Sequence, residues 1–193
     1  MSLAVLDMSM SLDGFIAGPN EGPGNGLGDG GERLHDWAAA AIGGGRLEGA
    51  DGEVFDELMS TGAVVAGRQT FELADGWHGD HHDGAPIFIY SRREPGIDIS
   101  RWPLVTYVPD VATALTRAKH AAGDKDVLVH GAAVAQLALA AGLLDELQIH
   151  LVPVLLGQGR RLFDHLAAEH VELKCIRILE GGAVTHLRYR VRR

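Results

Sequence analysis

The chain has 193 residues, of which 46% are hydrophobic and 22% charged, and its formal net charge is −9 at pH 7. This length suits one hydrophobic core and is short for two, so we expect a single domain over residues 1–193. The negative charge argues against nucleic acid as a partner, because nucleic-acid-binding domains present a basic face, although a few local arginines can still hold one phosphate.

The sequence also limits where the protein works. Its apolar runs are far shorter than the ~20 residues that span a bilayer, so no membrane partner is expected. The first residues lack the basic and apolar regions of a signal peptide. Cys175 is the only cysteine, which excludes a disulfide framework and a cysteine-based metal site. We therefore expect a cytoplasmic protein without a bound metal.

The first predicted element is a buried strand over residues 3–10. It runs into Asp13, Gly14 and a Gly-Pro-Asn turn, and a strand that ends in a carboxylate and a glycine is typical of a flexible loop over a ligand. Residues 22–31 contain too much glycine for a helix or a strand, which predicts a mobile surface loop. We expect residues 11–31 to act as a lid.

Two short helices and a strand are predicted next. Apolar residues at helical spacing predict a helix over residues 32–42, and Asp51 is the expected cap of a second helix. A strand over residues 63–66 ends at Gly67, and Thr70 is the expected cap of a short helix that follows it.

The rest of the chain alternates strands with helices. After a polar loop over residues 76–85, strands are predicted over residues 86–90, 104–108, 127–129 and 147–156. One helix is expected to begin at the N-cap Asp110, and another covers residues 133–141. A turn over residues 157–161 precedes a hairpin made by residues 171–179 and 183–191. This order predicts an α/β fold whose central sheet is mostly parallel, with the antiparallel hairpin at one side.

The ends of three predicted strands carry residues that suit a nucleotide ligand, because ligands of open α/β sheets bind at the carboxyl ends of strands. After His130, Gly131 allows the close approach of a pyrophosphate, and the next helical turn offers free N–H groups. These N–H groups are those of Ala132, Ala133 and Val134. A tight turn that binds nothing is the alternative. The segment lacks the G-x-G-x-x-G motif, so a Rossmann dehydrogenase is not predicted.

Basic and hydroxyl side chains follow the other two strand ends. Gly67 allows close approach, Arg68 offers a guanidinium fork to a phosphate, and Thr70 offers a hydroxyl. Ser91 and Arg92 begin a Ser-Arg-Arg segment that suits the additional ribose phosphate of NADP rather than NAD. Each arginine could instead be a solvated surface residue.

Two carboxylates and a group of histidines are further candidates for chemistry. Asp13 could tether the loop or contact a ligand amide, but an aspartate before a glycine is also common in turns. Asp36 could hold or protonate a nitrogen heterocycle, or lie on the solvent face of its helix. His78, His81 and His82 lack the spacing of a helical zinc motif, so we expect a solvated loop there.

Four stretches carry a resemblance to a known family. They are MSMSLDGFIAGPN (8–20), TGAVVAGRQTFE (61–72), the long segment 127–163 and the closing hairpin. With them, nearly the whole chain resembles the dihydrofolate reductase-like superfamily, and it is most similar to the bacterial branch related to the C-terminal reductase domain of the bifunctional riboflavin-biosynthesis deaminase/reductase. The resemblance implies a three-layer fold with helices on both faces of the central sheet and NADPH across the strand ends.

The resemblance also implies roles by position. The residues that border the nicotinamide are Phe15 and Ile16. Those that take the adenosine ribose phosphate are Arg68, Ser91 and Arg92. The pyrophosphate is held by residues 131–134. The zinc motif of the deaminase domain is absent.

The expected activity is that of an NADPH-dependent reductase resembling the 5-amino-6-(5-phosphoribosylamino)uracil reductase of riboflavin biosynthesis. Dihydrofolate or another pterin is the alternative substrate. The first substrate needs a cation for its phosphate, and the candidates are Arg33, Arg46, Arg160 and Arg161. A pterin needs a buried carboxylate, for which Asp36 is the test. An alternative of another class is a protein that binds a nucleotide or flavin without turning it over.

A homodimer is also expected. Residues 147–156 form a long apolar stretch with few charges, and apolar surface of this kind often marks an interface. The branch that the chain resembles forms dimers as well.

Overall fold

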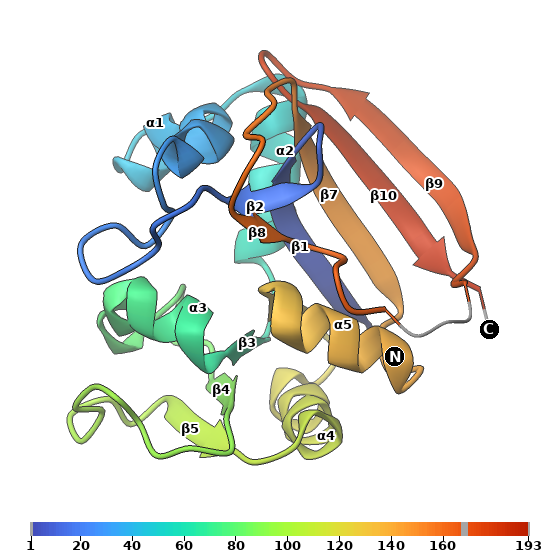
Figure 1. Ribbon diagram of the computed structural model, residues 1–193. Coiled ribbons are helices and arrows are strands. Elements are labelled where there is room, and N and C mark those ends of the chain that lie inside the picture. The colour runs from blue at the N-terminus through green and yellow to red at the C-terminus, as the bar shows by residue number, and fades with distance from the viewer. Residues whose placement is uncertain (1, 167–169, 193) are drawn as a thin grey trace.

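Six parallel strands, extended at one side by an antiparallel pair, form the centre of the molecule (Figure 1). The computed structural model describes residues 2–166 and 170–192. The strand order in the 8-stranded sheet is β5-β4-β3-β6-β1-β7-β10-β9. The strands are β1 (Ala4–Ser11), β3 (Ala63–Gly67), β4 (Ile87–Tyr90), β5 (Val105–Val108), β6 (Val127–His130), β7 (Glu146–Val152), β9 (Leu173–Glu180) and β10 (Thr185–Val191). Because β10 runs antiparallel to both β7 and β9, the predicted α/β fold with a C-terminal hairpin is confirmed.

Helices cover both faces of this sheet, as predicted (Figure 1). On one face, α4 (Val111–Ala122) and α5 (Ala132–Ala140) pack on a core that includes Val65 and Val129. On the other face, Phe71 of α3 (Arg68–Leu73) packs on Val64 and Ala66. Since neighbouring residues of β3 serve opposite faces, this strand shows the continuous apolar run of a strand that is buried on both sides.

Alternation along β1 separates its apolar side chains from its polar ones. The core beneath α5 contains the even-numbered side chains Ala4, Leu6 and Met8. Asp7 and Ser9 are also buried, but they point to the opposite face, because successive side chains of a strand alternate. Ser9 is in register with His150 of β7, which is in turn opposite His186 of β10. Buried polar groups therefore lie side by side across three strands.

The helices before β3 differ in detail from the sequence prediction. The first part of the predicted helix is the 3-10 helix η1 (Gly31–Ala38), and only α1 (Ala39–Ile42) is α-helical. Leu34 and Trp37 are both buried, and the three-residue period of a 3-10 helix brings them onto one face. Asp51 is not the cap of α2 (Gly49–Met59), because the helix begins before it. Its carboxylate instead accepts hydrogen bonds from His186 and from the N–H of Gly182.

Three other local predictions have mixed outcomes. Thr70 is not a cap, since α3 begins at Arg68 and Thr70 lies in its first turn. The expected turn over residues 157–161 contains β8 (Arg160–Arg161), which pairs with β2 (Phe15–Ala17) in a 2-stranded sheet. Asp110 caps α4 as predicted, because its carboxylate accepts a hydrogen bond of 2.7 Å from the N–H of Thr113.

The polar segment after α3 is more ordered than a solvated loop. It begins with η2 (Asp75–Gly79), in which Gly76, Trp77 and His78 have φ values of 60°, 47° and 51°. This left-handed turn is unfavourable for side-chain-bearing residues and is typical of functional or constrained segments. The solvated loop is wrong for His82, which is 4% exposed and donates a hydrogen bond of 3.0 Å to the carbonyl of Thr61.

The glycine-rich part of residues 11–31 folds back on itself. The N–H of Gly18 donates to the carbonyl of Leu27 at 2.8 Å, and the N–H of Asp29 donates to the carbonyl of Pro19 at 2.7 Å. A side chain on Gly18 would collide with the carbonyl of Asp29. The glycines therefore permit a close-packed loop with its own hydrogen bonds, where the sequence predicts a mobile one. None of the helices within residues 2–166 and 170–192 has the length and apolar character to cross a membrane.

Candidate functional site

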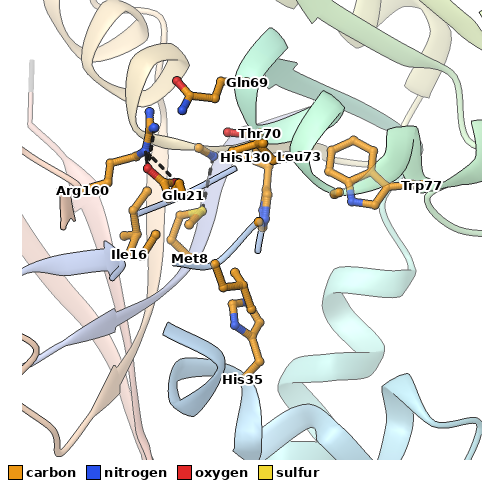
Figure 2. Close-up of a pocket in the computed structure, with 15 residues that line it drawn as sticks. Met8, Ile16, Glu21, His35, Gln69, Thr70, Leu73, Trp77, His130 and Arg160 are labelled. Atoms are coloured by element: carbon orange, nitrogen blue, oxygen red, sulfur yellow. Dashed lines mark hydrogen bonds and ion pairs between the residues drawn. The ribbon is translucent and has the colours of Figure 1, made fainter. Parts of the chain in front are cut away.

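Three adjoining cavities form one cleft near the carboxyl ends of the parallel strands. The outer cavity, about 260 Å³, lies between the ends of β3 and β4 and includes Arg68, Ser91 and Arg92 in its wall. The central cavity, about 360 Å³, is drawn in Figure 2. The inner cavity, about 490 Å³, lies between β1, η1 and α2. The outer and central cavities share Gln69, Thr70 and Arg160, and the central and inner cavities share His35, Trp77 and His130.

The outer cavity brings together most of the residues that the sequence predicts for a cofactor. Its lining residues among them are Gly67, Arg68, Thr70, Ser91, Arg92 and Ala133. Arg68 is not free, because its guanidinium pairs with Glu72 at 2.9 Å. Arg92 is exposed, and none of the ion pairs between described residues involves its guanidinium. Arg93 also lines this cavity, is exposed and is outside those ion pairs, so Arg92 and Arg93 are the cations of this cavity that are best able to meet an anionic ligand.

Gly131 has a different local role from the one predicted. It has a φ of 96°, and a side chain there would collide with the hydroxyl of Thr70. Its N–H donates to the sulfur of Met8 at 3.3 Å. The missing side chain thus lets α3 approach the start of α5, and the N–H of Gly131 already has a partner. Of the predicted pyrophosphate segment, Ala132 and Val134 are buried and Ala133 is exposed at the cleft.

Of the two loop residues expected to border the nicotinamide, one lines the cleft and the other lies outside it. Ile16 lies in the wall of the central cavity (Figure 2). Phe15 is absent from the lining of all three cavities and lies beneath the guanidinium of Arg161, 4.3 Å from its ring centre. Since neighbours on β2 point to opposite sides, Ile16 and Phe15 cannot both face the cleft.

Asp13 is also outside the cleft and acts as a tether. Its carboxylate accepts hydrogen bonds from the hydroxyl of Ser11 at 2.6 Å and from the N–H groups of Leu156 and Gly157 at 3.1 and 2.7 Å. The hydrogen bond from Ser11, supported by those backbone donors, lowers the pKa of Asp13 to about 2. The carboxylate is thus charged at neutral pH and suited to holding the loop rather than to donating a proton.

Asp36 does not reach the cleft, which corrects the prediction of a catalytic role. Its side chain is 55% exposed and pairs with Arg33 at 2.9 Å. The neighbouring Trp37 is the buried residue of this 3-10 turn. Its indole N–H donates to the hydroxyl of Ser9 at 2.9 Å. The predicted helix therefore faces the site with its tryptophan, one residue away from the predicted carboxylate.

The inner cavity has a wall of aromatic, apolar and neutral polar groups. Asp7 is its carboxylate, and its histidines are His35, His81, His130 and His150. Its described lining includes neither lysine nor arginine. Burial lowers the pKa of His35 to about 4 and that of His81 to about 3, with His130 contributing to both shifts. Burial also lowers the pKa of His130. These three rings are therefore neutral at pH 7.

Two ring nitrogens at the junction of the central and inner cavities have no protein partner. Nδ1 of His35 and Nδ1 of His130 are buried and make no hydrogen bond to the described residues. Figure 2 shows both rings beside the central cavity, with Trp77 at its far end. Since buried polar atoms are nearly always hydrogen-bonded, these nitrogens indicate a place where a polar ring can bind.

Histidines that the sequence analysis missed complete the inner wall. His150 and His186 are each 1% exposed and lie against the indole of Trp37, with ring centres 4.5 and 5.0 Å from it. Nε2 of His150 is hydrogen-bonded to Oδ1 of Asp7 at 2.9 Å. A signal was present in the sequence, because an aspartate and a histidine inside apolar strands are buried polar residues that need partners. Among the described residues, no group of three or more His, Cys, Asp or Glu has the geometry of a metal site.

Comparisons with known proteins agree with this architecture. The family model described as the RibD C-terminal domain matches residues 3–187. A search of curated proteins gives no match. Among solved structures, a protein of Shewanella sp. PV-4 assigned to riboflavin biosynthesis is 21% identical with a TM-score of 0.74, and each chain is covered by 100%.

Two further structures belong to longer chains. RibD of Acinetobacter baumannii is 19% identical with a TM-score of 0.68, and the match covers 100% of this chain and 59% of that one. The deaminase/reductase of Thermotoga maritima, named for 5-amino-6-(5-phosphoribosylamino)uracil, is 12% identical with a TM-score of 0.64, over 98% of this chain and 56% of that one. At these identities the similarity concerns the fold, and this chain spans less than two thirds of either protein.

Proposed function

Because the chain belongs to the family of the RibD C-terminal domain, we propose that it is an NADPH-dependent reductase of a small nitrogen heterocycle. One observation carries this proposal, the continuity of the three cavities. An arginine-bearing outer cavity leads through a central cavity to a histidine-lined inner cavity. A dinucleotide with a charged end, meeting a flat ring at its other end, needs a cleft of this shape.

The residues present fit NADPH. Arg92 and Ser91, with the more constrained Arg68, suit the ribose phosphate in the outer cavity. The exposed first turn of α5 at Ala133 suits the pyrophosphate. Ile16 and other apolar groups of the central cavity suit the nicotinamide. NADPH, when bound there, supplies the hydride.

The inner cavity favours an unphosphorylated heterocycle over the phosphorylated riboflavin precursor. Of the arginines considered for a substrate phosphate, Arg46 is exposed and outside the lining of the three cavities. Arg33 pairs with Asp36, Arg160 forms a two-pronged pair with Glu21 at 2.6 and 2.8 Å, and Arg161 covers Phe15. A phosphate beside the carboxylate of Asp7 would lose its hydration without gaining a cation. A ring N–H can instead donate to Asp7, so a pterin-like or unphosphorylated pyrimidine ring suits this cavity better.

The test is oxidation of NADPH in the presence of dihydrofolate, of 5-amino-6-(5-phosphoribosylamino)uracil and of its dephosphorylated form, followed by the loss of NADPH absorbance. We expect turnover of an unphosphorylated compound and weaker binding of NADH than of NADPH. NADPH binding without oxidation by any of the three compounds would favour the alternative of a non-catalytic nucleotide-binding protein. Faster turnover of the phosphorylated compound would contradict our choice of substrate.

We also propose a homodimer, although for a different reason from the apolar stretch at residues 147–156. Leu147, Ile149 and Val152 of that stretch are buried, whereas Leu155 is 69% exposed. The edge strand β9 carries further exposed apolar residues, among them Leu173 at 41% and Ile178 at 60%. These two are register partners of Val191 and Leu187, so the apolar surface extends over β10. Light scattering tests the proposal, and a monomeric mass at micromolar concentration would contradict it.

A further inference from the structure

Four titratable side chains form a continuous hydrogen-bonded row from the inner cavity to the protein surface. Asp7 Oδ1 is 2.9 Å from His150 Nε2, His150 Nδ1 is 2.8 Å from His186 Nδ1, and His186 Nε2 is 2.9 Å from Asp51 Oδ1. Asp7 and His150 line the cavity. At the other end, the side chain of Asp51 is 18% exposed, while both histidines are 1% exposed. We call these four residues the polar row.

Counting protons shows what the polar row must carry. Each of its three contacts needs one proton between its two heavy atoms. Two neutral imidazoles between two ionised carboxylates supply only two protons. One of the three contacts would then have a lone pair on both of its atoms and no proton between them. The row therefore holds a third proton. This proton can reside on Asp51, on either imidazole or on Asp7 while all three contacts stay intact, and such a row can conduct a proton.

The surroundings hold the two rings in place. Trp37 packs against both histidines, and its own N–H is fixed by Ser9. Asp51 is fixed from a second side by the N–H of Gly182 at 3.2 Å. Burial lowers the pKa of His186, while the hydrogen bond to Asp51 opposes this shift, so His186 gives up its proton readily. A purely structural role, joining α2 to the hairpin, would not require Asp7 to reach a cavity and Asp51 to reach solvent.

We propose that the polar row delivers the proton that accompanies hydride transfer to the substrate, and this rests on the proposed reductase function. The substrate carbon of a C=N or C=O group gains the hydride with its two electrons, and the π pair moves to the nitrogen or oxygen. That atom takes the proton of the Asp7 carboxyl group, so one O–H bond breaks and one N–H or O–H bond forms.

The other members of the polar row replace the proton that Asp7 loses. Asp7 receives its proton from Nε2 of His150, Nδ1 of His150 receives one from Nδ1 of His186, and Nε2 of His186 receives one from Asp51, which takes its proton from water. The row delivers a second proton only after both imidazoles have returned to their starting tautomers, which requires each ring to turn within its site. Asp7 is thus the group that touches the substrate, while His186 and Asp51 act through their neighbours.

The first experiment needs no turnover. Proton and nitrogen NMR of the ligand-free protein should show a strongly deshielded proton shared by His150 and His186, and it should disappear in His186→Gln. His120→Gln is the matched control, since His120 is exposed on α4. Two rings without a shared proton in the wild-type spectrum would overturn the polar row whether or not the protein is a reductase.

The second experiment follows dihydrofolate reduction by NADPH in His186→Gln and Asp51→Asn, the latter because it keeps the shape of the side chain if His186→Gln does not fold. We expect kcat to fall by ~10–100-fold with an increased solvent deuterium isotope effect, and NADPH affinity to remain unchanged. Unchanged kcat and isotope effect in both variants would overturn the relay and leave the reductase proposal standing. A wild-type protein that shows the shared proton but oxidises no NADPH would remove the reductase proposal, and with it the relay's role, while leaving the polar row itself.

Discussion

The outer cavity is walled by arginines at the ends of two strands, whereas the inner cavity is walled by histidines and aromatic rings that belong to the core. Arg92 is exposed, while His150 and His186 are each 1% exposed and pack against Trp37. A ligand in the outer cavity meets flexible charges that water otherwise hydrates. A ligand in the inner cavity meets groups whose positions the fold itself fixes. Substitutions in the outer cavity should therefore change ligand affinity. Substitutions in the inner cavity should change the free energy of unfolding of the whole protein.

The largest effect should follow from Trp37→Ala. This change removes a buried indole that packs on two histidines and binds Ser9, so we expect a loss of ~3–5 kcal/mol in the free energy of unfolding. Urea denaturation measures it. Arg92→Ala is the matched change in the outer cavity and should alter stability by less than about 0.5 kcal/mol. An equal loss of unfolding free energy in both variants would contradict the proposed difference between the two cavities.

Arg92→Ala should instead weaken the binding of NADPH. The loss of one charge-assisted contact corresponds to ~1.5–3 kcal/mol in binding free energy, and NADH affinity should hardly change. Fluorescence titration with both cofactors measures the difference. Arg101→Ala is a suitable control, because Arg101 is exposed and outside the lining of the three cavities. Equal weakening for NADPH and NADH would contradict a contact with the ribose phosphate.

Acid should weaken the inner cavity more than the outer one, because buried histidines line only the inner and central cavities. The pKa of His35 falls from its ordinary 6.5 to about 4 on burial, so between these values the unfolded chain binds a proton that the folded protein does not. Stability should therefore be complete above pH 6.5 and decrease as the pH falls toward 4, by on the order of 3 kcal/mol. Urea denaturation across this range should show a smaller decrease for His35→Gln than for the wild type, and the same decrease for His120→Gln. An unaltered pH dependence in His35→Gln would contradict this assignment.

The smallest effect should come from the loop that lines the central cavity. NADPH should slow amide exchange across residues 13–31 and leave β9 and β10 unchanged, because contacts of the ligand with the loop would add to the loop's own hydrogen bonds. Asp13→Asn weakens the tether to residues 156–157 and should lower turnover several-fold, while NADPH affinity changes by less than about twofold. Exchange that is indifferent to saturating NADPH would show that these residues are only a connector.

The two cavities also differ in how far the sequence predicts them. Gly67, Arg68, Ser91 and Arg92 lie in short contiguous segments at strand ends, and the general rule for ligands of open α/β sheets brings those ends together. Asp7 and His150, in contrast, are 143 positions apart, and only the register of β1, β7 and β10 joins them. No local pattern contains that register.

The sequence pattern also does not identify which residue of a predicted helix faces the core. The spacing of apolar residues locates a helical segment near Trp37, but a 3-10 and an α-helix of the same sequence present different residues to the core. The spacing therefore predicts a role for Asp36 that its exposed position contradicts, and it predicts a helix cap at Asp51, whose carboxylate is hydrogen-bonded to His186. The polar residues inside the apolar strands held the missing information, because a buried charge needs a partner.

The position of β10 between β7 and β9 has a consequence for folding during synthesis of the chain. His186 lies near the end of the chain, and yet it is a neighbour of residues from the first strand. As the chain leaves the ribosome, the arginine-bearing strand ends can assemble first, while the polar row has to wait for the closing hairpin. A product that terminates before residue 186 would lack one of the four members of the polar row and the strand that pairs with β7 beside His150. In such a product His150 would have no link to Asp51, so the order of synthesis makes this row the last polar network of the sheet to form.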